Sequence, residues 1–287
     1  MSRTQRTIPF TKMTGSGNDF IIIDNRDLKV SPEDGRELAR LACRRKLSAG
    51  ADGLILIEND PETDFVWRFF NADGSEAEMC GNGARCAARF AILKGITAKE
   101  RFSFRTLAGI IQARVSGQTA TVAMTQPHDL KRDISIDVCG QAMSLDFINT
   151  GVPHAVYFTG SPQELEEMDI CGRGRAIRCH ERFQPAGTNA DFAFVSDPHH
   201  MQVRTYERGV EDETLACGTG CIAGALTAAA GGLVESPVHV LTRSGETLTI
   251  HFEKVLEGSR TSFSAVFLEG GARVVYDAEL WDETLRA

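Results

Sequence analysis

The sequence predicts an α/β (α+β) fold built as two similar units, and three observations lead to that class. A chain of 287 residues is too long for one small core, so two compact units of about 100 to 150 residues each are expected. Short strand-like runs alternate with helical patterns along the whole chain. At an offset of 137 residues the chain matches itself, in several residues and in the order of its predicted elements.

Short apolar or alternating runs, bounded by Gly, Asp and Asn, predict the strands of the first half. These runs cover residues 20–24, 53–57, 65–70, 101–106, 109–115 and 119–124. Ser31 followed by Pro32 predicts a helix start, because Ser caps the first turn and Pro suits the first helical position. A second helix is expected over residues 84–93, ending at Gly95.

The stretch Gln126-Pro127-His128 interrupts this pattern, and the order of elements then begins again. Strands of the second half are predicted at residues 142–149, 154–158, 191–195 and 200–206. Ser161 and Glu164 have the spacing of a capping box, which opens a helix. An alanine-rich helix is expected over residues 221–230, closed by Gly-Gly and followed by more strands.

The repeat centres on two cysteines, Cys80 in MCGNGARC and Cys217 in ACGTGC. The same offset pairs residues around both of them. These further pairs are Val66 with Val203, Phe69 with Tyr206, Glu76 with Glu213, Gly81 with Gly218, Gly83 with Gly220, Ala88 with Ala225 and Ala91 with Ala228. We interpret the repeat as a duplicated unit whose copies are related by a pseudo-two-fold axis. Such an axis would bring two equivalent helix starts toward a shared cleft.

Composition excludes several classes of function. A net charge of −8, without a long run of Lys or Arg, argues against a nucleic-acid partner. No apolar run approaches the roughly 20 residues that a membrane span needs, so no membrane association is expected. The polar start MSRTQRTIPF lacks the apolar stretch of a secretion signal, which predicts a cytoplasmic protein. Because thiols stay reduced there, we do not interpret the eight cysteines as a disulfide framework.

Each of the two paired cysteines immediately precedes a predicted helix. The backbone amides that follow, in Gly81-Asn82-Gly83 and Gly218-Thr219-Gly220, are then expected to be unpaired donors at the positive end of a helix dipole. Such an end binds anions, and glycine lets the backbone approach a ligand closely. A carboxylate held there would be stabilised most when its α-carbon loses a proton. The same dipole is expected to lower the pKa of each thiol.

Two thiols suit the inversion of a stereocentre, because that reaction needs a base on one face of the carbon and an acid on the other. In the reverse direction the two roles are exchanged. One thiolate and one thiol, Cys80 and Cys217, therefore serve both directions from a single site. The sequence thus predicts a cofactor-independent amino-acid epimerase.

The cysteines and the glycines around them could also indicate a metal site, a dinucleotide site or a structural role. Neither Cys80 with Cys86 nor Cys217 with Cys221 forms a CxxC pair or has a neighbouring His, so no metal site is predicted. The glycine motifs do not complete GxGxxG, which argues against dinucleotide binding. A single cysteine before a helix is usually a small buried apolar residue, and only the pairing favours catalysis. We interpret the remaining cysteines as structural: Cys43, Cys86, Cys139, Cys171, Cys179 and Cys221.

Five blocks of sequence resemble the diaminopimelate epimerase family in content and order. They are TKMTGSGNDFIIID, GADGLILI, FFNADGSEAEMCGNGARCAARF, GTNADF and YERGVEDETLACGTG, which together span nearly the whole chain. The resemblance implies conversion of LL-2,6-diaminopimelate to the meso form without pyridoxal phosphate or any other cofactor, in lysine and cell-wall synthesis. It also implies a homodimer acting on a small amino-acid substrate.

The family fold implied is a pair of α/β domains, each a strongly curved mixed sheet or barrel around a central helix. Its last strand returns to the first domain, which places residues 1–124 with 273–287 in one domain and 125–272 in the other. The family pattern assigns catalysis to Cys80 and Cys217 and places His154 beside them, near Glu207. The substrate-binding positions it implies are Asn18, Asn71, Gly81, Asn82, Asn189, Glu207, Arg208, Gly218 and Thr219.

Two departures from the family pattern concern the substrate pocket. Val152 stands where many members have Asn, and Gly53 where many have Gln. The first bears on recognition of the distal end of the substrate, and the second removes one polar contact near the amino group. Alternatives therefore stay open: a related two-cysteine racemase or epimerase for proline-type substrates, or a non-catalytic carboxylate-binding protein. Isomerases of the phenazine pathway share the implied fold but lack the cysteines.

Overall fold

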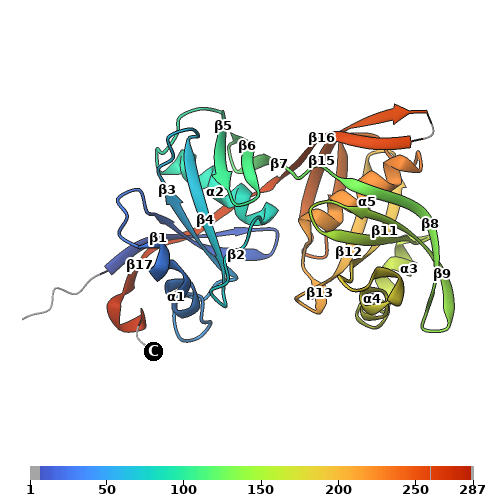
Figure 1. Cartoon of the computed structure of the whole chain (residues 1–287), viewed down its shortest axis with the longest axis horizontal. Helices are drawn as coiled ribbons and strands as arrows, with labels where there is room; N and C mark the ends of the chain where they lie inside the picture. The colour runs from blue at the N-terminus through green and yellow to red at the C-terminus, as the bar shows by residue number, and fades with distance from the viewer. Residues whose placement is uncertain (1–6, 259, 286–287) are drawn as a thin grey trace, which may run out of the picture. The chain divides into compact units, whose positions relative to one another are not determined.

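The computed structural model describes residues 7–258 and 260–285 (Figure 1). Two compact units make up the chain: Met1–Val122 with Gly270–Ala287 form unit 1, and Ala123–Glu269 form unit 2. Among the described helices, none is both long enough and apolar enough to cross a membrane.

Unit 1 is a mixed sheet whose strand order begins with the last strand of the chain. In spatial order its strands are β17 (Arg273–Trp281), β1 (Thr7–Gly15), β2 (Asn18–Asp24), β3 (Gly53–Glu58), β4 (Phe65–Asn71), β5 (Arg101–Thr106), β6 (Gly109–Ser116) and β7 (Thr119–Ala123). The pairs β2–β3 and β4–β5 are parallel, and the others are antiparallel. In Figure 1 the red β17 lies beside the blue β1.

Unit 2 repeats this plan strand for strand. In spatial order its strands are β8 (His128–Val138), β9 (Gln141–Asn149), β10 (Pro153–Phe158), β11 (Asn189–Asp197), β12 (His200–Glu207), β14 (Val238–Leu241), β15 (Thr247–Glu257) and β16 (Arg260–Gly271). Here β10–β11 and β12–β14 are the parallel pairs. A short additional strand, β13 (Asp212–Thr214), pairs with the end of β12. The order of parallel and antiparallel pairs is therefore the same in both units, as a duplication predicts.

Each parallel pair is connected by helices, as parallel strands require. In unit 1, α1 (Pro32–Ala42) joins β2 to β3 and α2 (Gly81–Leu93) joins β4 to β5. In unit 2, α3 (Pro162–Glu167) and α4 (Ile170–Cys179) join β10 to β11, and α5 (Gly218–Ala230) joins β12 to β14. The short 3-10 helices are η1 (Glu181–Phe183) and η2 (Asp282–Leu285).

The sheet of each unit curves around one helix. In unit 1, α2 packs against β1, β2, β3 and β6, and in unit 2, α5 packs against β9, β10, β11, β12, β14 and β15. Helix α1 covers the other face of β3 and β4, and α4 covers β11 and β12. Because both faces of β3 are covered, all of its residues are buried. Leu54 and Leu56 face the α1 side, while Ile55 reaches α2 beside Gly83. This arrangement confirms the predicted curved sheet around a central helix.

Most predicted elements are present within one or two residues, and several predicted caps are confirmed. Ser31 caps α1 by accepting from the amide of Asp34 at 3.1 Å. Ser161 likewise accepts from the amide of Glu164 at 3.1 Å, but the Glu164 carboxylate accepts from Gly160 instead of closing the box on Ser161. The helices predicted at 84–93 and 221–230 begin three residues earlier, at Gly81 and Gly218.

Three of the longer elements were not predicted, namely β1, β8 and α4, and neither were the short β13, η1 and η2. Helix α4 contains Gly172 and Gly174, which lower intrinsic helix propensity. Gly174 has a packing role, because a Cβ at this position would lie 2.3 Å from Cβ of Tyr206 in the neighbouring strand β12. Strand β8 begins at His128, where the sequence indicated a break, and its first six residues are largely exposed and polar.

Candidate active site

Both catalytic candidates are the N-cap residues of the central helices. Cys80 caps α2 and Cys217 caps α5, each with an extended backbone. The sulfur of Cys80 accepts from the amide of Gly83 at 3.5 Å, and that of Cys217 accepts from Gly220 at 3.4 Å. The prediction that the Gly83 and Gly220 amides are unpaired is therefore wrong. The amides of Gly81, Asn82, Gly218 and Thr219 are the others that a helix start leaves without an intrahelical acceptor.

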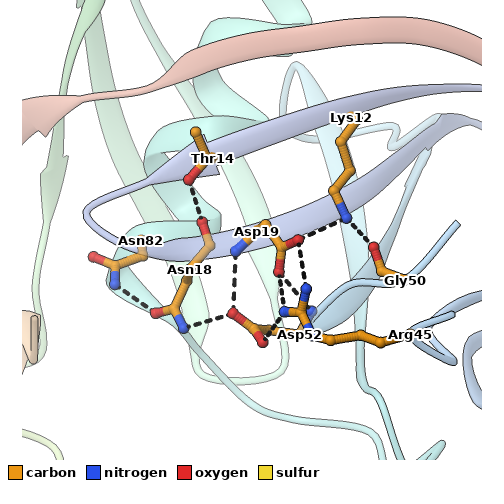
Figure 2. Close-up of polar contacts among 8 residues, drawn as sticks. All are labelled: Lys12, Thr14, Asn18, Asp19, Arg45, Gly50, Asp52 and Asn82. Atoms are coloured by element: carbon orange, nitrogen blue, oxygen red, sulfur yellow. Dashed lines mark hydrogen bonds and ion pairs between the residues drawn. The ribbon is translucent and has the colours of Figure 1, made fainter. Parts of the chain in front are cut away.

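In unit 1, Cys80 is half-buried and is followed two residues later by Asn82, which belongs to a cluster of polar contacts. Asn82, in the first turn of α2, donates its side-chain amide to Oδ1 of Asn18 at 2.6 Å. The Asn18 amide in turn donates to Oδ2 of Asp52 at 3.0 Å (Figure 2). Asn18 and Asn82, two of the predicted substrate-binding residues, are therefore in direct contact.

Asn71 and Gly53 lie opposite each other in the β3–β4 register. The Asn71 amide is exposed and donates to the hydroxyl of Ser75 at 3.0 Å. A side chain at Gly53 would meet the ring of Phe69 at 2.5 Å and the carbonyl of Phe70 at 2.8 Å. The aromatic ring of Phe69 thus occupies the space that a longer side chain at position 53 would need.

In unit 2, Cys217 is only 7% exposed and has acidic neighbours. Burial raises the pKa of Cys217 well above its usual value, and the charges of Glu207 and Asp191 add to this. The Thr219 hydroxyl, 3.4 Å from the sulfur, and the Gly220 amide act in the opposite direction. The prediction that the helix end lowers this thiol's pKa is therefore wrong for Cys217, because desolvation outweighs the helix dipole.

His154 belongs to a buried hydrogen-bonded chain in unit 2. Its side chain and that of Asp191 are both 0% exposed, with Nδ1 of His154 2.7 Å from Oδ2 of Asp191. On the other side, Nε2 of His154 lies 3.4 Å from the amide nitrogen of Asn189. Asn189 accepts from the Arg208 backbone amide at Oδ1 and donates to the Pro153 carbonyl, which fixes its nitrogen toward His154. The imidazole of His154 is thereby held between a carboxylate on one side and an amide on the other.

Glu207 is the last residue of β12, and Arg208 follows it beside this chain. Burial raises the pKa of the Glu207 carboxyl, and Asp191 raises it further, while Thr214 and His154 lower it. The Arg208 guanidinium donates to the carbonyl of Ala186 at 2.7 Å. Thr219 is held through its own carbonyl, which accepts from the Thr150 hydroxyl at 3.2 Å. One cluster in unit 2 thus contains His154, Asn189, Glu207, Arg208, Cys217 and Thr219.

Val152 lies in the turn before β10. Its side chain is half-buried, and its carbonyl accepts from the amide of Thr150 at 3.1 Å. The backbone of this turn is thereby held in place by Thr150, the residue that also contacts Thr219.

Two aspartates that contact these residues were not predicted, Asp52 and Asp191. Each lies in a block whose Asn or Gly was assigned a role: GADG for Asp52 and GTNADF for Asp191. Because alternate residues of a strand share a face, Asp191 lies on the same face as Asn189, and that spacing could have identified it. Among the described residues, no group of three or more His, Cys, Asp and Glu side chains is arranged to hold a metal ion.

Comparison of the sequence with known families and proteins gives a consistent result. The sequence model of the family Diaminopimelate epimerase matches residues 10–129 and 147–260. A diaminopimelate epimerase of Aquifex aeolicus is 47% identical over 96% of this chain and 99% of its own length. One from Archaeoglobus fulgidus is 40% identical over 97% of this chain and 98% of its own length.

Solved structures with the same fold are more distant in sequence. A phenazine biosynthesis protein of the PhzF family from Bacillus anthracis matches with a TM-score of 0.73 and 15% identity, over 96% of this chain and 99% of that one. A hydroxyproline epimerase from Agrobacterium vitis, solved with bound trans-4-hydroxy-L-proline, matches with a TM-score of 0.65 and 17% identity, over 98% and 94%. These likenesses concern the fold.

Proposed function

This chain belongs to the diaminopimelate epimerase family, and we propose that it converts LL-2,6-diaminopimelate into the meso form with Cys80 and Cys217 as its two catalytic groups. The observation that carries the proposal is the duplication of one device. In each unit the chain runs from the corresponding strand, β4 or β12, through a loop to an N-cap cysteine and then into the buried central helix. A binding protein would need the helix-end donors but not a second, equivalent thiol.

The reaction proposed is a proton transfer across one carbon. A cysteine thiolate on one face removes the α-hydrogen as a proton, and the C–H electron pair spreads into the adjacent carboxylate. The thiol of the other cysteine then gives its proton to the opposite face, which inverts the centre. One thiol and one thiolate are present before and after the step, with their positions exchanged.

The helix ends supply the stabilisation that this step needs. Negative charge builds on the carboxylate oxygens as the proton leaves, and preorganised amide donors lower the energy of that state. We assign this role to the amides of Gly81 and Asn82 in unit 1 and of Gly218 and Thr219 in unit 2. Asn71, Asn189, Glu207 and Arg208 are assigned to the substrate's amino groups and distal carboxylate.

The surroundings of Cys217 favour the protonated thiol in the ligand-free protein. Its burial and the neighbouring carboxylates of Glu207 and Asp191 disfavour a second negative charge. We infer that Cys217 begins as the proton donor and Cys80 as the base. His154, which also lies beside Glu207, is assigned a supporting role in setting these charges.

The remaining inferences concern the setting of the enzyme. We infer a homodimer, supported by the row of exposed apolar side chains on β17, namely Val274, Val275, Tyr276 and Trp281. Both cysteines must stay reduced for proton transfer, which supports a cytoplasmic enzyme. The product named for the relatives implies a place in lysine and cell-wall precursor synthesis.

Incubation with LL-diaminopimelate in deuterated water, without added cofactor, tests the proposed function. Solvent deuterium should appear at the inverted carbon, because the incoming proton comes from a thiol that exchanges with solvent. Mass spectrometry and chiral separation of the product give the measurement. Parallel incubation with proline and hydroxyproline covers the alternative substrate class; inversion of these, with no reaction of diaminopimelate, would overturn the assignment.

A further inference from the structure

A chain of hydrogen bonds in unit 1 runs from a buried guanidinium to a carboxylate. Nη2 of Arg85 donates to Oδ1 of Asn82 at 3.0 Å. The amide nitrogen of Asn82 donates to Oδ1 of Asn18 at 2.6 Å, and that of Asn18 donates to Oδ2 of Asp52 at 3.0 Å. Figure 2 shows the part of this chain from Asn82 to Asp52.

The two ends of the chain fix the orientation of both amides. A guanidinium can only donate, and a carboxylate can only accept. Asn82 must therefore turn its oxygen to Arg85 and its nitrogen to Asn18, and Asn18 must turn its nitrogen to Asp52. Each amide nitrogen uses one N–H within the chain. The second N–H of Asn18 and of Asn82 is left to point elsewhere.

The carboxylate end is held by cations on its other side. Arg45 donates to Oδ1 of Asp52 at 2.8 Å and to Oδ1 of Asp19 at 2.7 Å, so one guanidinium joins the two aspartates (Figure 2). Lys12 pairs with Asp19 at 2.8 Å. Burial alone raises the pKa of Asp19, but the hydrogen bonds from Arg45 and Lys12 leave it lowered. Asp52 also accepts from the Asp19 backbone amide at 3.1 Å, which fixes its oxygens in place.

The hairpin that carries Asn18 is shaped for this contact. Ser16 and Gly17 form a two-residue turn with φ values of 52° and 90°, and Gly15 pairs with Asn18. Ser16 is buried in the left-handed region, which costs a non-glycine residue about 1 kcal/mol. Its hydroxyl accepts from Arg85 at 2.8 Å, so the turn also holds the donor end of the chain.

We propose that Asp52 is a positioning residue that acts through Asn18, holding the Asn18 and Asn82 amides so that both turn an N–H toward a substrate carboxylate. The observation behind it is a hydrogen-bonded chain whose direction is fixed at both ends. This inference rests on the proposed function, since it names the group that these amides meet. Donors in one fixed orientation suit a carboxylate and disfavour an ammonium group at the same place.

Asp52→Asn tests the proposal because it removes the charge and one acceptor oxygen at the end of the chain with little change in shape. Asp52 now accepts from Arg45 at Oδ1 and from both Asn18 and the Asp19 backbone amide at Oδ2, and the variant leaves these donors a single neutral oxygen. The Asn18 amide is then held less firmly, and its second N–H is no longer kept on the substrate. We expect KM for LL-diaminopimelate to rise about tenfold with kcat within about threefold of wild type, the pattern for lost uniform binding.

A double-mutant cycle separates positioning from general structural damage. If Asp52 acts through Asn18, the variant Asn18→Ala/D52N should have the same KM as Asn18→Ala alone. Asp60→Asn is the matched control: Asp60 accepts from a backbone amide, that of Thr63 at 2.9 Å, and from Arg105 at 3.2 Å, in the loop after β3. The KM of Asp60→Asn should equal that of wild type, while its Tm should change by about as much as that of D52N.

The outcomes are distinct. An unchanged KM in D52N, or additive effects in the double variant, overturns the positioning role while leaving the proposed function intact. Absence of inversion by the wild-type enzyme overturns the proposed function itself. If D52N does not fold, Arg45→Gln is the second variant, because the Arg45 side chain is largely exposed. This change removes the guanidinium that holds Oδ1 of Asp52. An unchanged KM in Arg45→Gln likewise contradicts the proposal.

Discussion

The cysteine-bearing helix starts of the two units share a backbone plan but differ in how far the cysteine is exposed. In both, an N-cap cysteine accepts from the amide three residues ahead, at 3.5 Å for Cys80 and 3.4 Å for Cys217. Cys80 is half-buried. Cys217 is 7% exposed, and the charges of Glu207 and Asp191 act on it. The geometry of the helix start is therefore the same in both units, while the burial of the two thiols differs.

The hydrogen-bonded chains behind the two cysteines show the same divergence. Each ends on an aspartate: Asp52 in unit 1, through Asn18, and Asp191 in unit 2, through His154. Asp52 is joined to the exposed guanidinium of Arg45, whereas Asp191 is wholly buried and is joined to the Thr205 hydroxyl at 2.7 Å. The two units thus share a fold but differ in the partners of these aspartates.

Removing either thiol should have the largest effect and tests whether both cysteines are necessary. Cys80→Ala and Cys217→Ala should each lower the rate of inversion by at least about a thousandfold, because each removes a group that transfers a proton in the reaction. The rate of diaminopimelate inversion and the far-ultraviolet circular dichroism are the measurements. Cys179→Ala, at an exposed cysteine ending α4, is the control and should be fully active. Near-full activity in either test variant would refute the two-base scheme.

Reactivity with iodoacetamide should sharpen the difference between the thiols. At neutral pH Cys80 should be alkylated at least about ten times faster than Cys217, because iodoacetamide reacts with the thiolate and must be able to reach it. Peptide mass mapping over time measures both rates in one sample. Equal rates would remove the asymmetry described above.

The pH dependence of Cys217 alkylation tests the cause of that asymmetry. The Glu207 carboxylate raises the pKa of Cys217, so removing its charge should lower that pKa. In Glu207→Gln the alkylation profile of Cys217 should therefore shift to lower pH, by about one unit, with the profile of Cys80 as internal reference. A profile that stays in place, or moves to higher pH, would contradict the assigned role of Glu207.

The smallest expected effect concerns stability and contrasts Gly53 with its counterpart at the 137-residue offset, Ala190. A Cβ at Gly53 would meet Phe69 and the Phe70 carbonyl, whereas Ala190 is accommodated with its side chain fully buried. Gly53→Ala should reduce the free energy of unfolding by about 1–3 kcal/mol through overpacking. Urea denaturation measures this, with Gly271→Ala as a control, because its Cβ meets no neighbour within 4 Å and its φ lies outside the left-handed region. A Gly53→Ala variant as stable as wild type would show that the Phe69 ring moves aside freely.

The strands and central helices could be predicted because their signals are local. Alternating runs such as 101–106 and the Ser31-Pro32 cap depend on neighbours in sequence, and the structure confirms them. Helix α4 was missed because its glycine at position 174 is required by contact with Tyr206, far away in the chain. Burial of the kind that raises the pKa of Cys217 is likewise a tertiary property, so the dipole argument alone predicted the wrong direction.

The identities of the candidate cysteines followed from the repeat, but their supporting aspartates did not. Asp52 in GADG and Asp191 in GTNADF are ordinary turn or strand residues by sequence alone. Only the pairing of β2 with β3, and of β10 with β11, brings them beside Asn18 and His154. The catalytic and substrate-binding roles of the individual residues stay predictions that the variants above address.

Strand β17, the last of the chain, pairs with β1, the first, so unit 1 is assembled from both ends of the polypeptide. Unit 2 is continuous in sequence. During translation the ribosome therefore releases all of unit 2 before the edge of unit 1 can close. Until β17 has been synthesised, β1 pairs with β2 alone, and its other edge has no strand beside it.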